Sequence, residues 1–319
     1  MAFGRLIKKS TLKTINIVIF MVFLVFLIPV SGLAQSPKIA ITPLVFEFFS
    51  EPGESSEGII RVGNHSENTS ARIIIEIEDM FPEGEEGRVR LEVPQEERRT
   101  FSLSHWIETE PSEFVLGPGE EQRVEFIINV PEDAEPGGYY VSVVAGTHGI
   151  TPEGTGVAVR TRIGALILMA VSGETEEKLE VVSFDVPSYS ERGPIEFVAR
   201  FENKGTIHVR PDASIVVTNI LGRKVAEIPL ESRNVLPGAV RRIEAEWDTG
   251  LLWGKYTATL SGTYGMANLP LNPVSVTFWG FPWKIALGAL IVLLLLGLTR
   301  KRWMVALRIL IKGEAGHPR

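Results

Sequence analysis

The chain has 319 residues, no cysteine, and 39 acidic against 32 basic residues, which gives a formal net charge of −7. The absence of cysteine excludes disulfide bonds, thiol chemistry and cysteine-ligated zinc. The acidic balance argues against nucleic acid as a ligand, because phosphate contacts need an excess of lysine and arginine.

The first 34 residues have the composition of a secretion signal. Four basic residues come first, an apolar run without charge covers Ile17–Val30, and small residues follow in Ser31–Ala34. A basic start, an apolar middle and small residues at the end are typical of a secretory signal. We therefore predict a signal peptide over residues 1–34, with an uncleaved N-terminal anchor as the alternative.

From residue 35 onward, short segments with an apolar residue at every second position alternate with proline and glycine turns. Val124–Val130, Ile195–Phe201 and Ile243–Trp247 show this alternation clearly. Such strands bury one face and expose the other, and many of them in succession predict an all-β fold of sandwiches. Ile163–Val171 is apolar at nearly every position. We expect it to be the last strand of a first sandwich, buried on both faces where two domains meet.

The strand pattern occurs twice along the chain. In both copies a Pro-Gly turn lies five residues before an arginine that opens an alternating strand; the prolines are Pro118 and Pro237. In each copy, a strand that begins with Gly and Tyr comes after the Pro-Gly turn, and a strand that ends in asparagine comes before it. These residues are Tyr139 and Asn64 in the first copy, and Tyr256 and Asn203 in the second. The tyrosines resemble the tyrosine corner of immunoglobulin-like domains. The repeat predicts two tandem immunoglobulin-like β-sandwiches, over residues 35–173 and 174–277.

The first copy contains an insertion at about residues 80–110. The distance from Asn64 to Leu116 is 52 residues, whereas the corresponding distance from Asn203 to Leu236 is 33. Insertions tend to lie in loops, and loops often carry function. Within the insertion, His105 and Trp106 are the candidate ligand-binding residues; the alternative is that Trp106 belongs to a strand and packs beneath the loop.

A second apolar segment lies near the C-terminus. No charge occurs between Ile285 and Leu298, and Trp279 and Trp283 stand where an interfacial aromatic belt is expected. The whole segment is about 30 Å long as a helix. We predict a transmembrane helix over residues 278–299, with a buried core helix as the alternative.

The residues around this span predict its orientation. Arg300, Lys301 and Arg302 follow it directly, so the positive-inside rule places residues 300–319 in the cytoplasm as a basic tail. The sequence thus predicts a single-pass cell-membrane protein with its N-terminal ectodomain outside the cytoplasm. Without the two ends, 21 basic and 38 acidic residues remain, a net charge of −17. This charge argues against polyanions and against tight attraction to anionic lipids, and it is compatible with basic or neutral partners.

No motif for catalysis or metal binding is present. None of the five histidines has a partner at a metal-binding spacing, and the zinc-protease and serine-hydrolase motifs are missing. Two acidic turns contain carboxylates of the kind that bind calcium, namely Glu85, Glu86, Glu132 and Asp133. They lack the EF-hand spacing, so solvated turns are favoured. We predict no enzymatic activity, no catalytic residue, no cofactor and no metal.

Four stretches of the first domain carry a family resemblance: Ile41–Pro43, the strand that ends in Asn64, Phe114–Val124 and Val130–Tyr139. Together with the order of signal, two immunoglobulin-like domains, span and basic tail, they resemble the WxL-interacting proteins of Gram-positive cell envelopes. In that family the first domain is described as peptidoglycan-binding and the second as binding a host or partner protein. The resemblance implies a membrane-anchored envelope protein that binds peptidoglycan or a secreted surface protein. The alternatives are a pilus-type periplasmic chaperone, against which the span counts, a receptor ectodomain and an envelope enzyme.

Overall fold

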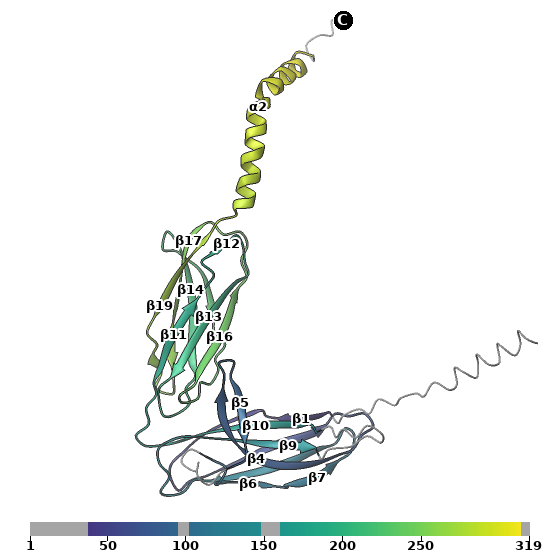
Figure 1. The fold of residues 1–319 in the computed structure, drawn as a ribbon, viewed down its shortest axis with the longest axis vertical. Helices are drawn as coiled ribbons and strands as arrows, with labels where there is room; N and C mark the ends of the chain where they lie inside the picture. Colours follow the sequence, from purple (N-terminus) through teal and green to yellow (C-terminus); the bar gives the residue numbers. More distant parts are fainter. Residues whose placement is uncertain (1–37, 95–101, 148–159, 314–319) are drawn as a thin grey trace, which may run out of the picture.

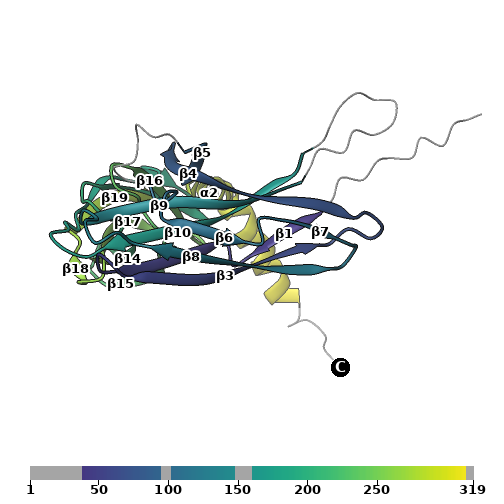
Figure 2. The ribbon, with the colours of Figure 1, turned by 90° about the horizontal axis from the view of Figure 1, so that it is seen from below.

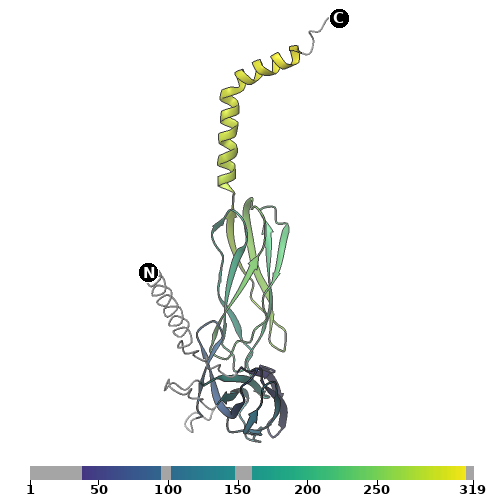
Figure 3. The same ribbon diagram turned by 90° about the vertical axis from the view of Figure 1, so that its right-hand side faces the viewer.

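The computed structural model describes residues 38–94, 102–147 and 160–313. Two β-sandwiches follow one another along the chain, and one long helix follows the second (Figures 1 and 3). The predicted all-β fold of two tandem sandwiches with a C-terminal apolar helix is thus confirmed. The first sandwich lies across the end of the second, and the helix leaves from the opposite end (Figure 1). The predicted signal peptide, residues 1–34, lies outside the described residues.

The first domain packs a four-stranded sheet on a six-stranded sheet (Figure 2). The four-stranded sheet consists, in spatial order, of β1 (Ile39–Thr42), β3 (Ser55–Asn64), β8 (Glu121–Asn129) and β6 (Ile107–Glu110). The six-stranded sheet consists of β2 (Val45–Ser50), β10 (Arg162–Val171), β9 (Gly137–Thr147), β4 (Ala71–Glu83) and β5 (Arg88–Glu92), with β7 (Glu113–Leu116) also paired to β4. The chain therefore changes sheets between β1 and β2, and β2 pairs with β10 in parallel.

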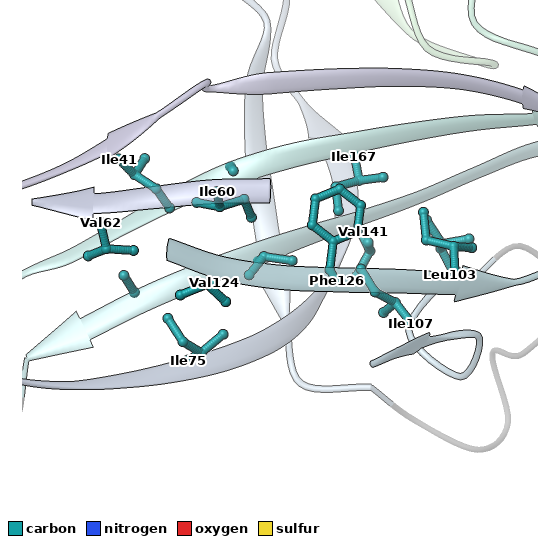
Figure 4. Packing of buried hydrophobic residues seen from close by; sticks show 14 of the residues in the cluster. Ile41, Ile60, Val62, Ile75, Leu103, Ile107, Val124, Phe126, Val141 and Ile167 are labelled. Carbon is teal, nitrogen blue, oxygen red and sulfur yellow. The ribbon is translucent and has the colours of Figure 1, made fainter. Parts of the chain in front are cut away.

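The core of the first domain lies between these two sheets (Figure 4). Val124, Phe126 and Ile128 of β8 are buried, and the residues between them are exposed, as their alternation predicts. The Phe126 ring packs edge-on against Phe46, with 5.0 Å between the ring centroids. It also lies over Gly58 of β3, where a Cβ atom would be 2.3 Å from the ring. Gly58 is therefore required for the close approach of this ring to the strand.

The second domain has the same two-layer design. Its three-stranded sheet consists of β11 (Leu179–Asp185), β13 (Ile195–Asn203) and β16 (Val240–Trp247). Its six-stranded sheet consists of β12 (Tyr189–Ser190), β19 (Val274–Gly280), β17 (Gly254–Tyr264), β14 (Pro211–Asn219) and β15 (Lys224–Pro229), with β18 (Leu269–Pro270) also paired to β17. Phe197, Phe201 and Phe278 are fully buried between the sheets. Residues 172–178 connect the two domains.

The two domains contain the same buried asparagine. Asn64 and Asn203, at the ends of β3 and β13, are 1% and 0% exposed. Their Nδ2 atoms donate to backbone oxygens, of Thr69, Leu116 and Gly117 in the first domain and of Ile207 and Val235 in the second. Each Oδ1 accepts the N–H two residues further on. Each asparagine thus joins the turn that follows its strand to the segment before the Pro-Gly turn.

Both predicted tyrosine corners are present, with opposite hydrogen-bond direction. The Tyr139 hydroxyl donates to the backbone oxygen of Glu135 at 2.9 Å. The Tyr256 hydroxyl instead accepts the N–H of Trp253 at 3.2 Å. In both cases the hydroxyl is bonded to backbone a few residues upstream, which is the arrangement typical of this feature.

The C-terminal helix α2 (Trp283–Gly313) starts later than the predicted transmembrane segment of residues 278–299. Phe278 belongs to β19 instead, and its buried ring stacks on Tyr256 with 5.4 Å between centroids. The alternation of Val274, Val276 and Phe278 extends the strand to this point, because each of these side chains faces the core. The helix also continues past residue 299 into the predicted tail.

Candidate functional site

The two predicted ligand-binding residues lie side by side but differ in exposure. His105 is exposed, whereas Trp106 is half-buried and packs on Tyr139, with 4.3 Å between ring centroids. The backbone of Trp106 is bonded to Leu103 and Asn129 at 3.0 and 2.8 Å. Trp106 thus has the packing contacts that the alternative derived from the sequence expects. Ligand binding by His105 and Trp106 stays a prediction.

The first of the two acidic turns, which contains Glu85, contacts the second domain. Glu85 accepts a hydrogen bond from Arg200 of the second domain at 2.7 Å. Within the described residues, no group of three or more His, Cys, Asp or Glu side chains is arranged to hold a metal ion. The turn that contains Glu85 therefore acts in a contact between the domains.

A cavity of about 600 Å³ lies at the junction of the two domains. Its floor is the outer face of the six-stranded sheet of the first domain, contributed by Val45, Met80, Val89, Leu166 and Leu168. Its other wall comes from the second domain, chiefly from Val235, Leu236, Ala239 and Val240. We call this space the inter-domain cleft. Such a volume lies within the usual range of about 300–1,000 Å³ for ligand pockets.

The floor of the inter-domain cleft explains the apolar composition of β10. Ala165, Ile167 and Met169 of this strand face the sandwich core. Leu168 faces the other way and forms a small apolar cluster with Met80 and Tyr140, against which Leu236 of the second domain packs. The predicted burial of this strand on both faces is therefore confirmed.

Four arginines line the rim of the cleft: Arg88, Arg210, Arg233 and Arg241. Three of them have carboxylate partners, which are Glu86, Glu47 and Glu231 respectively. Arg241 forms no ion pair within the described part of the chain, and its buried Nε has no hydrogen-bond partner there. Burial, and after it the charge of Arg233, lowers the pKa of Arg241 below its usual value. An unpaired guanidinium beside an apolar floor is suited to an anionic group of a ligand.

The turn between β4 and β5 fixes the two walls of the cleft to each other. In Figure 1 this hairpin extends from the first domain to the second. The backbone oxygen of Glu85 accepts the N–H of Arg242 in β16 at 2.7 Å, in addition to the bond from Arg200 to its carboxylate. Gly87, at φ +76°, lies against the Arg241 guanidinium, since a Cβ atom there would be 1.4 Å from Nη1. We call these contacts the hairpin clamp.

The substitution Gly87→Ala tests the hairpin clamp. We expect it to displace Arg241 and to broaden the distribution of distances between the domains, because the added methyl group overlaps the guanidinium. The distances are measured by double electron–electron resonance between spin labels at Val115→Cys in the first domain and Val182→Cys in the second, in the full chain. Gly222→Ala is the matched control, because Gly222 has φ +71° but no atom within 4 Å of its Cβ position. If the inter-domain distance distributions of Gly87→Ala and Gly222→Ala were equal, the hairpin clamp would not fix the two domains to each other.

A second contact between the domains involves a buried histidine. His208 of the second domain faces Tyr140 of β9, with 3.4 Å between Nδ1 and the hydroxyl oxygen. Burial lowers the pKa of His208, and burial raises the pKa of Tyr140, so both side chains are neutral near pH 7. Nearby, the backbone N–H of Gly138 donates to Thr206 at 3.0 Å. The first and second domains thus meet through polar as well as apolar contacts.

No family model and no curated protein matches the chain. Solved structures with a similar fold include the class 5 fimbriae chaperone CfaA, at 12% identity over 76% of this chain and 99% of that chain, with a TM-score of 0.38. The E. coli chaperone DraB matches at 11% identity over 76% and 97%, with a TM-score of 0.35. A PapD-like domain of human CEP192 matches at 17% identity over 46% and 96%, with a TM-score of 0.29.

Sequence reasoning did not identify the inter-domain cleft. Its floor and its walls come from strands that are far apart in the chain, and only their packing brings Leu168 and Arg241 together. Two signals pointed toward it: the apolar residues on both faces of β10, and the insertion, whose first part forms the hairpin clamp.

Proposed function

We propose that this protein is a non-enzymatic, membrane-anchored binding protein that holds a segment of a polypeptide partner in its inter-domain cleft. The observation that carries the proposal is the pairing of an apolar floor with the unpaired Arg241 on its rim. The peptidoglycan-binding role implied by the family resemblance is the alternative outcome of the test below.

The helix α2 supports anchorage in a membrane. Its segment Trp283–Arg300 has 18 residues and a mean hydropathy of 1.8, and none of it is buried against the rest of the described protein. As a helix this segment is about 27 Å long, close to the thickness of a bilayer core. A core helix of a soluble protein would be covered by other elements. The basic residues that follow the segment favour an extracytoplasmic position of both sandwiches.

The chemistry of the cleft favours a polypeptide over a glycan. Within the described residues no aromatic side chain lines it, so a sugar ring would have no flat apolar surface on which to stack. The aliphatic floor suits the side chains of a peptide. Arg241 suits a carboxylate, with which arginine forms charge-assisted hydrogen bonds. We therefore infer a partner segment that combines apolar residues with one carboxylate.

Peptide binding to the full chain in phosphatidylcholine nanodiscs tests this function. The probe is a fluorescent peptide of alternating valine and threonine with one central aspartate, and the matched control is the same peptide with asparagine. We expect saturable binding of the aspartate peptide, about tenfold or more tighter than that of the control, since a hydrogen bond to a charged group contributes about 1.5–3 kcal/mol. Equal binding of both peptides, or binding of soluble peptidoglycan fragments alone, would overturn the proposal.

A further inference from the structure

At the end of the second domain opposite the cleft, three segments that are separate in the sequence lie beside the start of α2. In the six-stranded sheet, Asn219 at the end of β14 is in register with Tyr256, and Tyr256 with Phe278 near the end of β19. The β14–β15 turn and the β16–β17 connection therefore lie at the same end as the helix, and so does β12, whose Tyr189 is in register with Trp279 of β19 (Figure 1). We call this end, formed by residues 189–192, 219–223, 248–255 and 279–284, the foot of the second domain.

Each segment of the foot exposes large apolar side chains. Ile220 and Leu221 at the tip of the β14–β15 turn are 70% and 73% exposed, and Trp253 of the β16–β17 connection is 56% exposed. Trp279 and Trp283 are also exposed. Trp253, Trp279 and Trp283 are the three exposed tryptophans in the part of the chain whose side chains are described, and all three lie in the foot. An exposed apolar patch of this kind marks an interaction surface.

The foot is joined directly to the helix. Only Phe281 and Pro282 separate β19 from α2. The Tyr189 hydroxyl donates to the backbone oxygen of Phe281, and the Phe281 ring packs edge-on against Trp253 with 5.7 Å between centroids. Lys284 in the first turn of the helix forms an ion pair with Glu191 at 3.1 Å. The foot is therefore held at the depth at which the helix enters the membrane.

The charges of the foot differ from those of the rest of the ectodomain. Arg192, Arg223 and Lys255 are exposed and have no ion-pair partner among the described residues. The acidic residues of the foot are Glu191, which is paired with Lys284, and Asp248. The foot thus has an excess of positive charge in an ectodomain that is otherwise strongly acidic. A basic surface next to a span is attracted to anionic headgroups by about 1 kcal/mol per residue.

We propose that the foot of the second domain is a lipid-binding surface that lies in the headgroup region of an anionic bilayer. Leu221, Trp253 and Trp279 occupy the interface, where the amphipathic rings of tryptophan are enriched. The exposed arginines and lysine contact lipid phosphates. The second domain consequently stands upright on the membrane and holds the inter-domain cleft at a fixed height. This inference rests on the proposed membrane anchorage, but not on the identity of the partner in the cleft.

The test uses environment-sensitive probes on single cysteines, because the chain has no cysteine of its own. The full chain is labelled with NBD at Leu221→Cys and placed in nanodiscs of phosphatidylcholine with or without phosphatidylglycerol, each containing a headgroup nitroxide lipid. Val115→Cys in the first domain is the water-exposed control, and Leu293→Cys in α2 is the anchor control. We expect quenching of the Leu221 probe, stronger with phosphatidylglycerol, and no quenching at Val115.

The two controls separate the possible failures. If the Leu221 probe is as unquenched as the Val115 probe while the Leu293 probe lies within the bilayer, the lipid-binding foot is wrong and the anchor stands. If the Leu293 probe also lies in water, the anchorage itself is wrong. The double substitution Arg192→Glu and Arg223→Glu is expected to remove the added quenching in phosphatidylglycerol. Unchanged quenching in that variant would contradict the role of the basic residues.

Discussion

Replacing Asn203 with aspartate is expected to lower the free energy of unfolding of the second domain by about 3–5 kcal/mol. Asn203 is fully buried, and its Nδ2 donates to two backbone oxygens at 2.8 Å each. Aspartate has an oxygen in place of this nitrogen, so one oxygen of a buried carboxylate would face two carbonyl groups away from water, and the other would keep only the N–H of Gly205. Leaving a buried charge without an opposite charge beside it is among the largest effects of a single substitution.

Hydrogen exchange of β13 and β14 in the full chain, followed against urea concentration, measures this effect. Asn219→Asp is the matched control, because Asn219 uses its side-chain oxygen, which aspartate retains, to accept the N–H groups of Leu221 and Arg223. We expect that control to unfold at the wild-type midpoint. Asn64→Asp is expected to destabilise the first domain in the same way as Asn203→Asp destabilises the second. A common midpoint for Asn203→Asp and Asn219→Asp would show that the buried amide does not stabilise the fold.

The second large effect is expected from Arg241→Glu in the inter-domain cleft. We expect this variant to bind the aspartate peptide at least about a hundredfold more weakly, a loss of about 3 kcal/mol, because an attraction to the ligand carboxylate becomes a repulsion. Arg241→Met, which keeps an unbranched apolar side chain but is shorter and lacks the guanidinium, is expected to lose about tenfold. Affinity is measured by fluorescence anisotropy with the full chain in phosphatidylcholine nanodiscs.

A matched charge reversal far from the cleft controls for the general field of the protein. Arg223→Glu changes the net charge by the same amount at the foot of the second domain, and it is expected to leave peptide affinity unchanged. The distance between spin labels at Val115→Cys and Val182→Cys, measured again in the Arg241→Glu variant, shows whether this substitution moves the two domains relative to each other. Equal losses for Arg223→Glu and Arg241→Glu would mean that the effect is one of total charge, and the assignment of Arg241 would fail.

Local patterns in the sequence were sufficient to predict the sandwiches. Alternation along β8 and β13 specified which side chains enter the core, because a strand has two faces and only one of them is buried. The repeat of Asn64 and Asn203 indicated that one set of turns is used twice. The start of α2 could not be placed from hydropathy, because Phe278 is apolar whether it lies in a sandwich core or in a bilayer.

The cleft could not be predicted in the same way, because it depends on the relative placement of two domains. Tryptophan and histidine in an insertion made His105 and Trp106 the candidates, yet Trp106 packs on Tyr139. The hairpin clamp and the unpaired state of Arg241 depend on which strand of the second domain lies next to Gly87. Residue type and spacing contain no information on that contact.

The central claim, that a carboxylate-bearing polypeptide segment lies between the two domains, is tested most directly by photo-crosslinking. The aspartate peptide is given a benzophenone group, irradiated with the full chain in nanodiscs, and the attached residue is identified by mass spectrometry. We predict attachment at Leu166, Leu168 or Leu236, abolished by excess unlabelled aspartate peptide and by Arg241→Glu. Attachment near His105 and Trp106, or attachment that excess peptide does not reduce, would contradict the account.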